Sequence, residues 1–297
     1  MKKIIECVPN FSTSDPQVVK AIADCFDNYG TLIGYESDID HNRAVITAAG
    51  SPKAVLKGLI KAVGVAVKHI DLNKHQGAHP RMGAVDVIPF VPVKNITKEE
   101  AVKISKIAAK KISQKYGIPI FLYAHSAARP NTVQLSDIRR GGFENMAKKM
   151  LEPQWKPDYG PQVPHKTAGV AACGARDFLV AFNINLNTSD VKIAKAIASK
   201  IRESNGGIKG VKALGLELKS QNSAQVSMNI TDVNCVSFFE IYNKVKELAR
   251  EYGVEIKNSE LVGYAPMRIL ASTVKEAIKL ENFDSHKALE YEILEKI

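Results

Sequence analysis

The chain has 297 residues, of which 45% are hydrophobic and 24% are charged, and these ordinary proportions exclude a mainly disordered chain. At about 150 residues per domain, this length predicts two domains. The 41 basic and 31 acidic side chains give a net charge of +10, which favours anionic partners.

The first half of the chain shows alternating strand and helix periodicities. Strands are predicted at Ile4 to Val8, Leu32 to Tyr35, Ala44 to Ala48, Val85 to Val91 and Ile120 to Tyr123. Helices are predicted at Asp15 to Tyr29, Pro52 to His69 and Thr97 to Tyr116. The half therefore opens in the order β-α-β-β-α-β.

Four prolines and two glycines interrupt the periodicity between Leu151 and Gly169, which indicates a connection between domains. The same element order then returns. Strands are predicted at Phe178 to Leu186, Val211 to Leu218, Ala224 to Ile230 and Val254 to Val262, with helices at Ser189 to Glu203 and Ser237 to Tyr252 and a helical tail from Pro266. This is the split βαβ, ferredoxin-like order, so we expect an α+β protein with domains at residues 1–177 and 178–297.

Two predicted strands of the second half carry uncharged polar side chains on one face. Alternate residues of a strand share a face, which groups Asn183 with Asn185, and Gln225 with Ser227 and Asn229. The other face of each strand is apolar and needs helices to cover it. Amides on the free face suit a polar cavity, although a plain solvated sheet face is equally compatible with the pattern.

The segment from Lys74 to Gly83 is the densest polar cluster and lies between a predicted helix and a strand. His75 and His79 have the i, i+4 spacing of a helical zinc pair. Gly77 between them and Pro80 after them argue against a helix there. A metal site is therefore disfavoured, and His79 remains open to a structural or an acid–base role.

Two other polar segments can be explained by local structure or by exposure to solvent. The run from Asp38 to Arg43 has the composition of a turn, although Arg43 has a guanidinium suited to a carboxylate. The lysines between Lys94 and Lys115 fit a solvated helix face. RNA binding would need aromatic residues interleaved on a sheet face, whereas the predicted open face carries Asn, Gln and Ser, so nucleic-acid binding is disfavoured.

Compartment and membrane association can also be addressed from the sequence. The longest stretch without a charged side chain runs from Tyr116 to Ala128, too short for a membrane helix of about 20 residues. The four cysteines are scattered, without a CxxC spacing. We therefore expect a cytoplasmic protein with reduced thiols and no membrane span.

Several motifs, spread in order over nearly the whole chain, resemble those of the glutamate formimidoyltransferases. They are Glu6 to Ser12, Asp38 to Arg43, Gly77 to Asp86, Asp158 to Pro161, His165 to Gly169, Gly174 to Arg176, Ala181 to Leu186, Gln225 to Asn229 and Leu261 to Gly263. Several of these stretches are long and unusual, and the third contains Gly77-x-His79-Pro80-Arg81-Met82-Gly83. The tail after about Met267 matches least.

The resemblance implies transfer of a formimino group from N-formimino-L-glutamate to N5 of tetrahydrofolate, a step of histidine degradation. Tetrahydrofolate is then a co-substrate, and no metal is required. The resemblance also implies two subdomains whose sheets face each other across a substrate tunnel. A homodimer and a separate cyclodeaminase partner are expected, with no nucleic-acid or membrane partner.

The resemblance assigns roles to particular residues as well. His79 corresponds to the catalytic histidine, and one imidazole can serve as both base and acid because its pKa of about 6.5 lies near operating pH. The folate-associated segment corresponds to Gly160, Pro161, Gln162, Val163, Pro164, His165, Lys166, Thr167, Ala168 and Gly169. Arg43 and Arg81 are candidates for carboxylate binding, and Asn183, Asn185, Gln225 and Asn229 for other substrate contacts.

Two alternatives of other classes remain open. One is a non-catalytic module that binds folate or another anion. The other is a metal-dependent hydrolase that uses His75 and His79. Turnover of formiminoglutamate in chelator-treated buffer separates these three hypotheses, because a binding module gives no turnover and a metal enzyme loses it.

Overall fold

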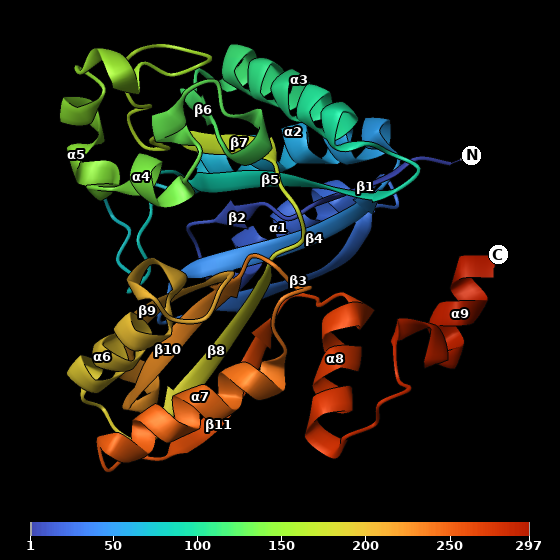
Figure 1. The fold of residues 1–297 in the computed structure, drawn as a ribbon. Helices are drawn as coiled ribbons and strands as arrows, with labels where there is room; N and C mark the ends of the chain where they lie inside the picture. Colours follow the sequence, from blue (N-terminus) through green and yellow to red (C-terminus); the bar gives the residue numbers. More distant parts are fainter. Residues whose placement is uncertain (1, 297) are drawn as a thin grey trace. The chain divides into compact units, whose positions relative to one another are not determined.

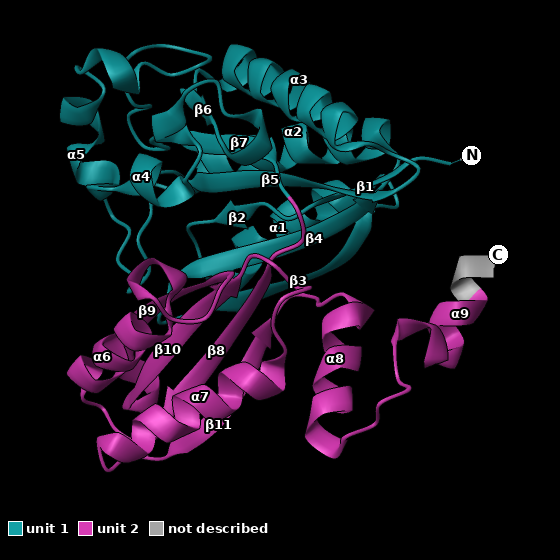
Figure 2. Ribbon diagram, viewed as in Figure 1, with its two compact units in different colours: residues 1–176 teal, residues 177–297 magenta. Residues whose placement is uncertain are grey.

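The computed structural model describes residues 2–296, so the outer limits of the two expected domains, Met1 and Ile297, lie outside the described residues. The chain divides into two compact units, Met1–Arg176 and Asp177–Ile297 (Figure 2). Both units combine helices with a sheet, which confirms the α+β class.

Unit 1 contains one sheet of seven strands (Figure 1). The strands are β1 (Ile4–Cys7), β2 (Asn10–Phe11), β3 (Leu32–Asp38), β4 (Arg43–Gly50), β5 (Val85–Lys94), β6 (Ile120–Leu122) and β7 (Ala171–Ala175). The helices are α1 (Pro16–Asp27), α2 (Pro52–His69), α3 (Lys98–Tyr116), α4 (Leu135–Arg139) and α5 (Gly142–Lys149).

The sheet of unit 1 has an antiparallel part and a parallel part. In the antiparallel part, β4 pairs with β3, β1 and β2, and β5 pairs with β1 and β2 on their other side. The expected β-α-β-β-α-β order is therefore present. Two parallel strands, β7 and β6, extend the sheet beyond β5, and the sequence pattern had not predicted β2 or β7.

Two apolar clusters build the core of unit 1. One joins the sheet to α1, α2 and α3 through buried residues such as Phe26, Leu59 and Ile112. The other contains Met82, Phe121, Ile138 and Met146 and joins β5, β6 and β7 to the region of α4 and α5. The sheet is thus packed on both faces at its parallel end, as parallel sheets usually are.

The helix starts follow directly from the sequence. The Asp15, Ser51 and Thr97 side chains accept hydrogen bonds from backbone N–H groups in the first turns of α1, α2 and α3. Thr97 and Glu100 form a capping box, which satisfies two backbone donors that a helix start leaves free.

The segment from Leu151 to Gly169 belongs to unit 1, so its interpretation as the connection between domains was wrong. Asp158 N and Tyr159 N donate to Ile120 O over 2.9 and 3.2 Å. After this segment, β7 inserts between β5 and β6. The prolines and glycines therefore mark a folded loop on unit 1, and unit 2 starts at Asp177.

Unit 2 contains a four-stranded antiparallel sheet in the order β11-β8-β10-β9. Its elements are β8 (Val180–Leu186), α6 (Val191–Ile201), β9 (Val211–Leu218), β10 (Ser223–Ile230), α7 (Phe238–Glu251) and β11 (Ile256–Val262). Two further helices follow, α8 (Met267–Ile278) and α9 (Leu289–Lys296), in agreement with the predicted helical tail.

The apolar face of the unit 2 sheet packs against its own helices. Phe182, Val226 and Met228 from the strands share one buried cluster with Ile197 of α6 and Ile241 of α7. The amide-bearing side chains lie on the opposite face, as their alternation predicts. Throughout residues 2–296, no helix combines the length and the apolar composition needed to cross a bilayer.

Candidate active site

Two polar loops of unit 1 interlock: the turn between β3 and β4, and the loop between α2 and β5. Asn42 Nδ2 donates to Gln76 O over 2.8 Å, and Ala78 N donates to Asp40 O over 2.9 Å. The loops are so close at Gly77 that a Cβ there would lie 2.4 Å from His41 O. Glycine is needed for this approach, and the contact brings two of the sequence motifs into one site.

His79 lies at this junction with one ring nitrogen engaged. Its Nδ1 is 2.8 Å from Pro80 O and 3.2 Å from Arg43 Nη1. A carbonyl only accepts and a guanidinium only donates, so Nδ1 satisfies one of them at a time. The shorter contact favours an N–H at Nδ1, which leaves the lone pair on Nε2. No hydrogen bond from any residue in 2–296 occupies Nε2.

The surroundings of His79 favour its neutral form. Burial, together with the positive charges of Arg43 and Arg139, holds the pKa of His79 well below its usual value of 6.5. Both effects disfavour the imidazolium, because burial removes its hydration and like charges repel it. The imidazole is therefore a neutral base at pH 7.

Asp86 on β5 organises the two arginines. Its Oδ2 accepts from Arg43 Nη2 over 2.8 Å and from Arg139 Nη2 over 2.7 Å, while Oδ1 accepts from Met82 N over 2.8 Å. Burial by itself would raise the pKa of Asp86, but Arg139 and Arg43 outweigh it and lower that pKa to about 2. The fully buried carboxylate thus fixes Arg43 beside His79.

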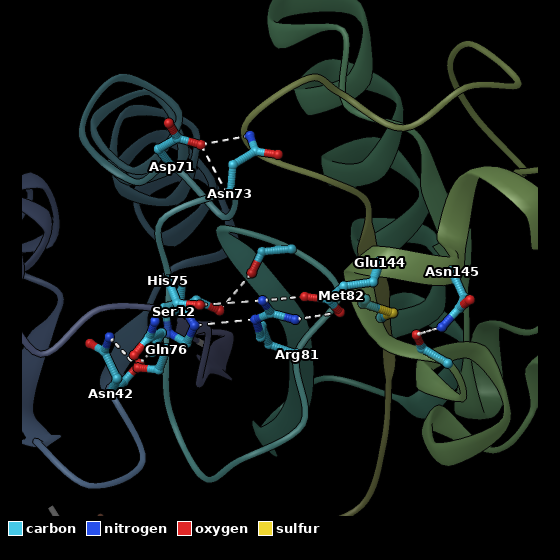
Figure 3. Close-up of polar contacts among 12 residues, drawn as sticks. Ser12, Asn42, Asp71, Asn73, His75, Gln76, Arg81, Met82, Glu144 and Asn145 are labelled. Atoms are coloured by element: carbon cyan, nitrogen blue, oxygen red, sulfur yellow. Dashed lines mark hydrogen bonds and ion pairs between the residues drawn. The ribbon is translucent and has the colours of Figure 1, made fainter.

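Arg81 holds a separate carboxylate within unit 1. Its Nη1 and Nη2 donate to the two carboxylate oxygens of Glu144 over 2.8 and 2.6 Å, and its Nε donates to His75 Nδ1 over 3.2 Å (Figure 3). A pocket of about 460 Å³ opens beside this group. It is lined by His75, Gln76, Gly77, Ala78, His79, Pro80, Arg81, Gly141, Gly142 and Glu144.

The contacts of His75 argue against a metal pair with His79. His75 Nε2 lies 2.9 Å from Asn42 O, and Nδ1 accepts from Arg81, so both nitrogens are engaged with protein groups. Burial, followed by the charge of Arg81, lowers the pKa of His75. This histidine joins the two loops and positions Arg81.

His41 is a second histidine near His79 that the sequence had not singled out. The two rings are 5.9 Å apart in an edge-to-face arrangement. His41 Nδ1 lies 3.6 Å from Asp38 Oδ1, and His41 Nε2 is buried without a hydrogen-bond partner among the described residues. The site therefore contains a second, partly buried imidazole, which packs against that of His79.

The predicted folate segment, residues 160–169, lies beside the His79 loop and is joined to it by backbone hydrogen bonds. Val170 N donates to Met82 O over 3.0 Å, Ala84 N donates to Ala168 O over 2.9 Å, and Leu72 N donates to Thr167 O over 2.9 Å. His165 and Gly169 exchange two backbone hydrogen bonds of 2.9 Å. The C-terminal half of the segment is thus a tight turn that leads into β7, and β7 pairs in parallel with β5, the strand that follows the His79 motif.

The other half of the folate segment is open to solvent. Pro161, Gln162 and Val163 are exposed, as is Lys166 in the turn itself. Gly160 has a φ of +94°, and a Cβ there would lie 2.4 Å from Ser113 Oγ. The loop between Gly160 and Gly169 therefore exposes backbone and side-chain groups that a ligand can contact, while close packing holds the two glycines in place.

The candidate binding residues of unit 2 lie together on the polar sheet face. Gln225 is opposite Asn185, and Ser227 is opposite Asn183. Asn183, Asn185 and Gln225 are buried, whereas Asn229 is exposed. Glu260 of β11, which the sequence had not identified, accepts from Asn185 Nδ2 over 2.7 Å and from Gln225 Nε2 over 3.3 Å.

Three charged residues of unit 1 were missed as site members, and only one had a signal. Asp86 is a lone charge inside the apolar stretch from Val85 to Val91, and a buried charge of that kind requires partners. Arg139 and Glu144 lie more than 50 residues from the side chains they bind, and nothing local in the sequence marks them.

Comparison with known proteins places both units in one family of domains. Residues 4–176 match the model of the formiminotransferase domain, N-terminal subdomain, and residues 181–289 match that of the formiminotransferase domain. A glutamate formimidoyltransferase from Streptococcus pyogenes serotype M1 is 46% identical over 97% of this chain and 98% of its own length.

More distant relatives show the same similarity. A glutamate formimidoyltransferase from Thermoplasma acidophilum is 40% identical over 97% of this chain and 96% of its own length. A formimidoyltransferase-cyclodeaminase from Dictyostelium discoideum is 38% identical over 95% of this chain, but the match covers only 54% of that longer protein.

Proposed function

The chain belongs to the formiminotransferase family, and from this premise we propose that it transfers the formimino group of N-formimino-L-glutamate to N5 of tetrahydrofolate in histidine degradation. The products are 5-formiminotetrahydrofolate and L-glutamate. The relatives named as glutamate formimidoyltransferases support this activity. The observation that carries the proposal is the position of the His79 imidazole, which lines a pocket and has its Nδ1 held against Pro80 O.

His79 is proposed to move the proton that the transfer requires. N5 attacks the formimino carbon and forms a C–N bond, and Nε2 of His79 accepts the proton from N5. The tetrahedral intermediate then breaks its C–N bond to the glutamate nitrogen, to which the imidazolium returns the proton. A base with a lowered pKa is neutral at the start and a stronger acid once protonated, so the same group suits both steps.

The folate is proposed to bind along residues 160–169. Support comes from the shared backbone hydrogen bonds between this segment and residues 82–84, which join the segment to the His79 motif. The amides of unit 2 are proposed to line a tunnel between the two sheets. Support for this part is a buried set of amides on a sheet face that the helices of unit 2 leave uncovered.

The two candidate arginines are proposed to play different parts. Arg43 binds Asp86 and contacts His79, which favours a positioning role over direct binding of a substrate carboxylate. Arg81 lies in the wall of the pocket and already binds the exposed carboxylate of Glu144. A substrate carboxylate would therefore exchange with Glu144 at this guanidinium.

Further proposals concern assembly and location. A homodimer in the cytoplasm is proposed, and the four cysteines, which form no disulfide among the described residues, agree with a reducing compartment. A separate cyclodeaminase is proposed to consume the product. Sedimentation analysis measures the mass of the assembly and so tests the dimer. Adding a purified cyclodeaminase, which closes the formimino group into the folate ring, tests whether the product is its substrate.

A direct assay tests the proposed activity. Purified protein is mixed with formiminoglutamate and tetrahydrofolate in chelator-treated buffer, and release of L-glutamate is measured. Transfer is expected at full rate, and it should fall about 10²–10⁴-fold in His79→Ala, while His69→Ala, which alters an exposed histidine at the end of α2, serves as the control. Folate binding without turnover would favour a binding module, and loss of turnover with chelator would favour a metal enzyme.

A further inference from the structure

Three side chains of unit 2 form a hydrogen-bonded chain with a fixed direction. Asn185 Nδ2 donates to Glu260 Oε1 over 2.7 Å, and Gln225 Nε2 donates to Asn185 Oδ1 over 2.9 Å. Gln225 Nε2 also lies 3.3 Å from Glu260 Oε2. The three residues come from neighbouring strands of one sheet, β10, β8 and β11.

The carboxylate of Glu260 sets this direction. An ionised carboxylate only accepts hydrogen bonds, so Asn185 must turn its NH₂ group towards Glu260 and its oxygen towards Gln225. Gln225 must then turn its own NH₂ group towards Asn185. Reversing either amide would place two acceptors against each other, which assigns the amide orientations without reference to hydrogen positions.

The chain ends on an acceptor that has no partner. Gln225 is fully buried, and its Oε1 is a buried atom without a hydrogen bond among the described residues. Glu260 forms no ion pair with any cation in residues 2–296. A buried acceptor and a partly buried, unneutralised carboxylate both favour a ligand that brings N–H donors.

We propose that Gln225 and Glu260 recognise an N–C–N edge with adjacent N–H donors, an inference that rests on the proposed function. Both substrates of that reaction carry such an edge. One is the formamidine group of formiminoglutamate, which is a cation at neutral pH. The other is the uncharged 2-amino-pyrimidinone edge of the folate ring. The unneutralised charge of Glu260 favours the formamidinium group, because an ionised pair strengthens the hydrogen bond.

The test compares ligands that differ only in this edge. N-formyl-L-glutamate replaces the formamidine =NH by =O and lacks the positive charge. Calorimetric titration of the full chain measures the Kd of formiminoglutamate, of N-formylglutamate and of tetrahydrofolate separately. Glu260→Gln and Gln225→Met are compared with the wild type. Glu255→Gln and Gln221→Met, at exposed positions of the same unit, are the matched controls.

The decisive quantity is the ratio of the Kd of N-formylglutamate to the Kd of formiminoglutamate. In the wild type formiminoglutamate should bind more tightly, and Glu260→Gln and Gln225→Met should reduce its preference over N-formylglutamate by about 10-fold to 100-fold. A misfolded variant would weaken both derivatives alike, and thermal melting checks the fold. A selective loss of tetrahydrofolate binding would support the same chemistry with the folate ring as its source. Unchanged affinities for all three ligands would overturn the proposal.

The titrations measure binding and test this proposal, whereas the glutamate-release assay measures turnover and tests the proposed function. If the wild type released no glutamate in the transfer assay, the proposed function would fail. The titrations would still show whether Glu260 and Gln225 select the formamidine group.

Discussion

Arg43 Nη1 lies 3.2 Å from Nδ1 of His79, and the same guanidinium is held by Asp86 through a hydrogen bond of 2.8 Å. A positive charge so close to an imidazole opposes its protonation. Because burial acts in the same direction, the pKa of His79 lies well below 6.5. The pair therefore keeps the proposed catalytic base ready to accept a proton at neutral pH.

The pH dependence of catalysis follows from this pair. In the wild type, the acid limb of kcat/KM should lie well below pH 6.5, because only protonation of His79 removes the base. Arg43→Gln removes the repelling charge, so the pKa of His79 should rise and the acid limb should move to higher pH. Histidine titration by NMR checks the shift independently of turnover. An acid limb that stays in place in Arg43→Gln would refute this coupling.

Asp86 should make the free energy of unfolding depend on pH in the acidic range. Its pKa is about 2 in the folded protein against 3.8 as the usual value, so its contribution is complete above pH 3.8. That contribution is lost as the pH falls from about 3.8 to about 2, and it amounts to about 2 kcal/mol.

Removing the charge of Asp86 leaves two arginines without their shared partner. Asp86→Asn should cost about 3–5 kcal/mol at pH 7, because Arg43 and Arg139 would remain largely buried and unpaired. The loss of stability between pH 3.8 and 2 should become smaller in this variant. Denaturant unfolding across that pH range measures both effects, with Asp27→Asn at an exposed position of α1 as the control. If the free energy of unfolding fell equally between pH 3.8 and 2 in Asp86→Asn and Asp27→Asn, Asp86 would not be the source of the acid sensitivity.

Sequence periodicity predicted the helices that have one buried face, whereas β7 was missed. The helix from Ser237 to Tyr252 was predicted from its periodic apolar residues, and α7 follows it closely. β7, in contrast, consists of five buried small residues, Ala171–Ala175. It lies between two parallel neighbours and has no alternation to detect.

The candidate site shows the same division between local and distant information. His79 stands in a compact motif whose neighbours in sequence are also neighbours in space. Arg139 meets Asp86 across 53 positions, and Glu260 meets Asn185 across 75. Pairings at such separation depend on which strands and loops the fold brings together, and local sequence patterns do not reveal them.

Gly169 should be essential for joining the folate segment to the His79 motif. Its φ is +64°, and a Cβ at this position would lie 2.2 Å from Met82 O. Gly169→Ala should therefore destabilise the protein by about 3 kcal/mol or more, and it should weaken tetrahydrofolate binding. Gly206→Ala also has a positive φ but meets no atom within 4 Å, so it isolates backbone strain from the clash. Equal melting temperatures for the two variants would exclude the proposed close approach.

Folate should protect residues 160–169 from proteolysis if it binds there. Lys166 is exposed in the middle of the segment, so trypsin can report on it. Saturating tetrahydrofolate should slow cleavage after Lys166 at least several-fold, because a ligand that binds the folded state reduces opening. Cleavage after Lys219, in an exposed turn of unit 2, serves as the internal reference. Equal protection at both lysines would indicate general stabilisation rather than binding at the segment.

Glu144 binds the Arg81 guanidinium at which we propose that a substrate carboxylate binds. The ion pair has two short hydrogen bonds, and Arg81 lowers the pKa of Glu144, so this carboxylate is charged at pH 7 and competes for the guanidinium. Because the Glu144 side chain is 59% exposed, its loss should hardly affect stability. Glu144→Gln should therefore lower KM for formiminoglutamate several-fold while kcat changes little. Glu247→Gln, which removes an exposed negative charge from α7, controls for net charge. A KM that rises in Glu144→Gln would show that Glu144 positions Arg81 instead of competing with the substrate.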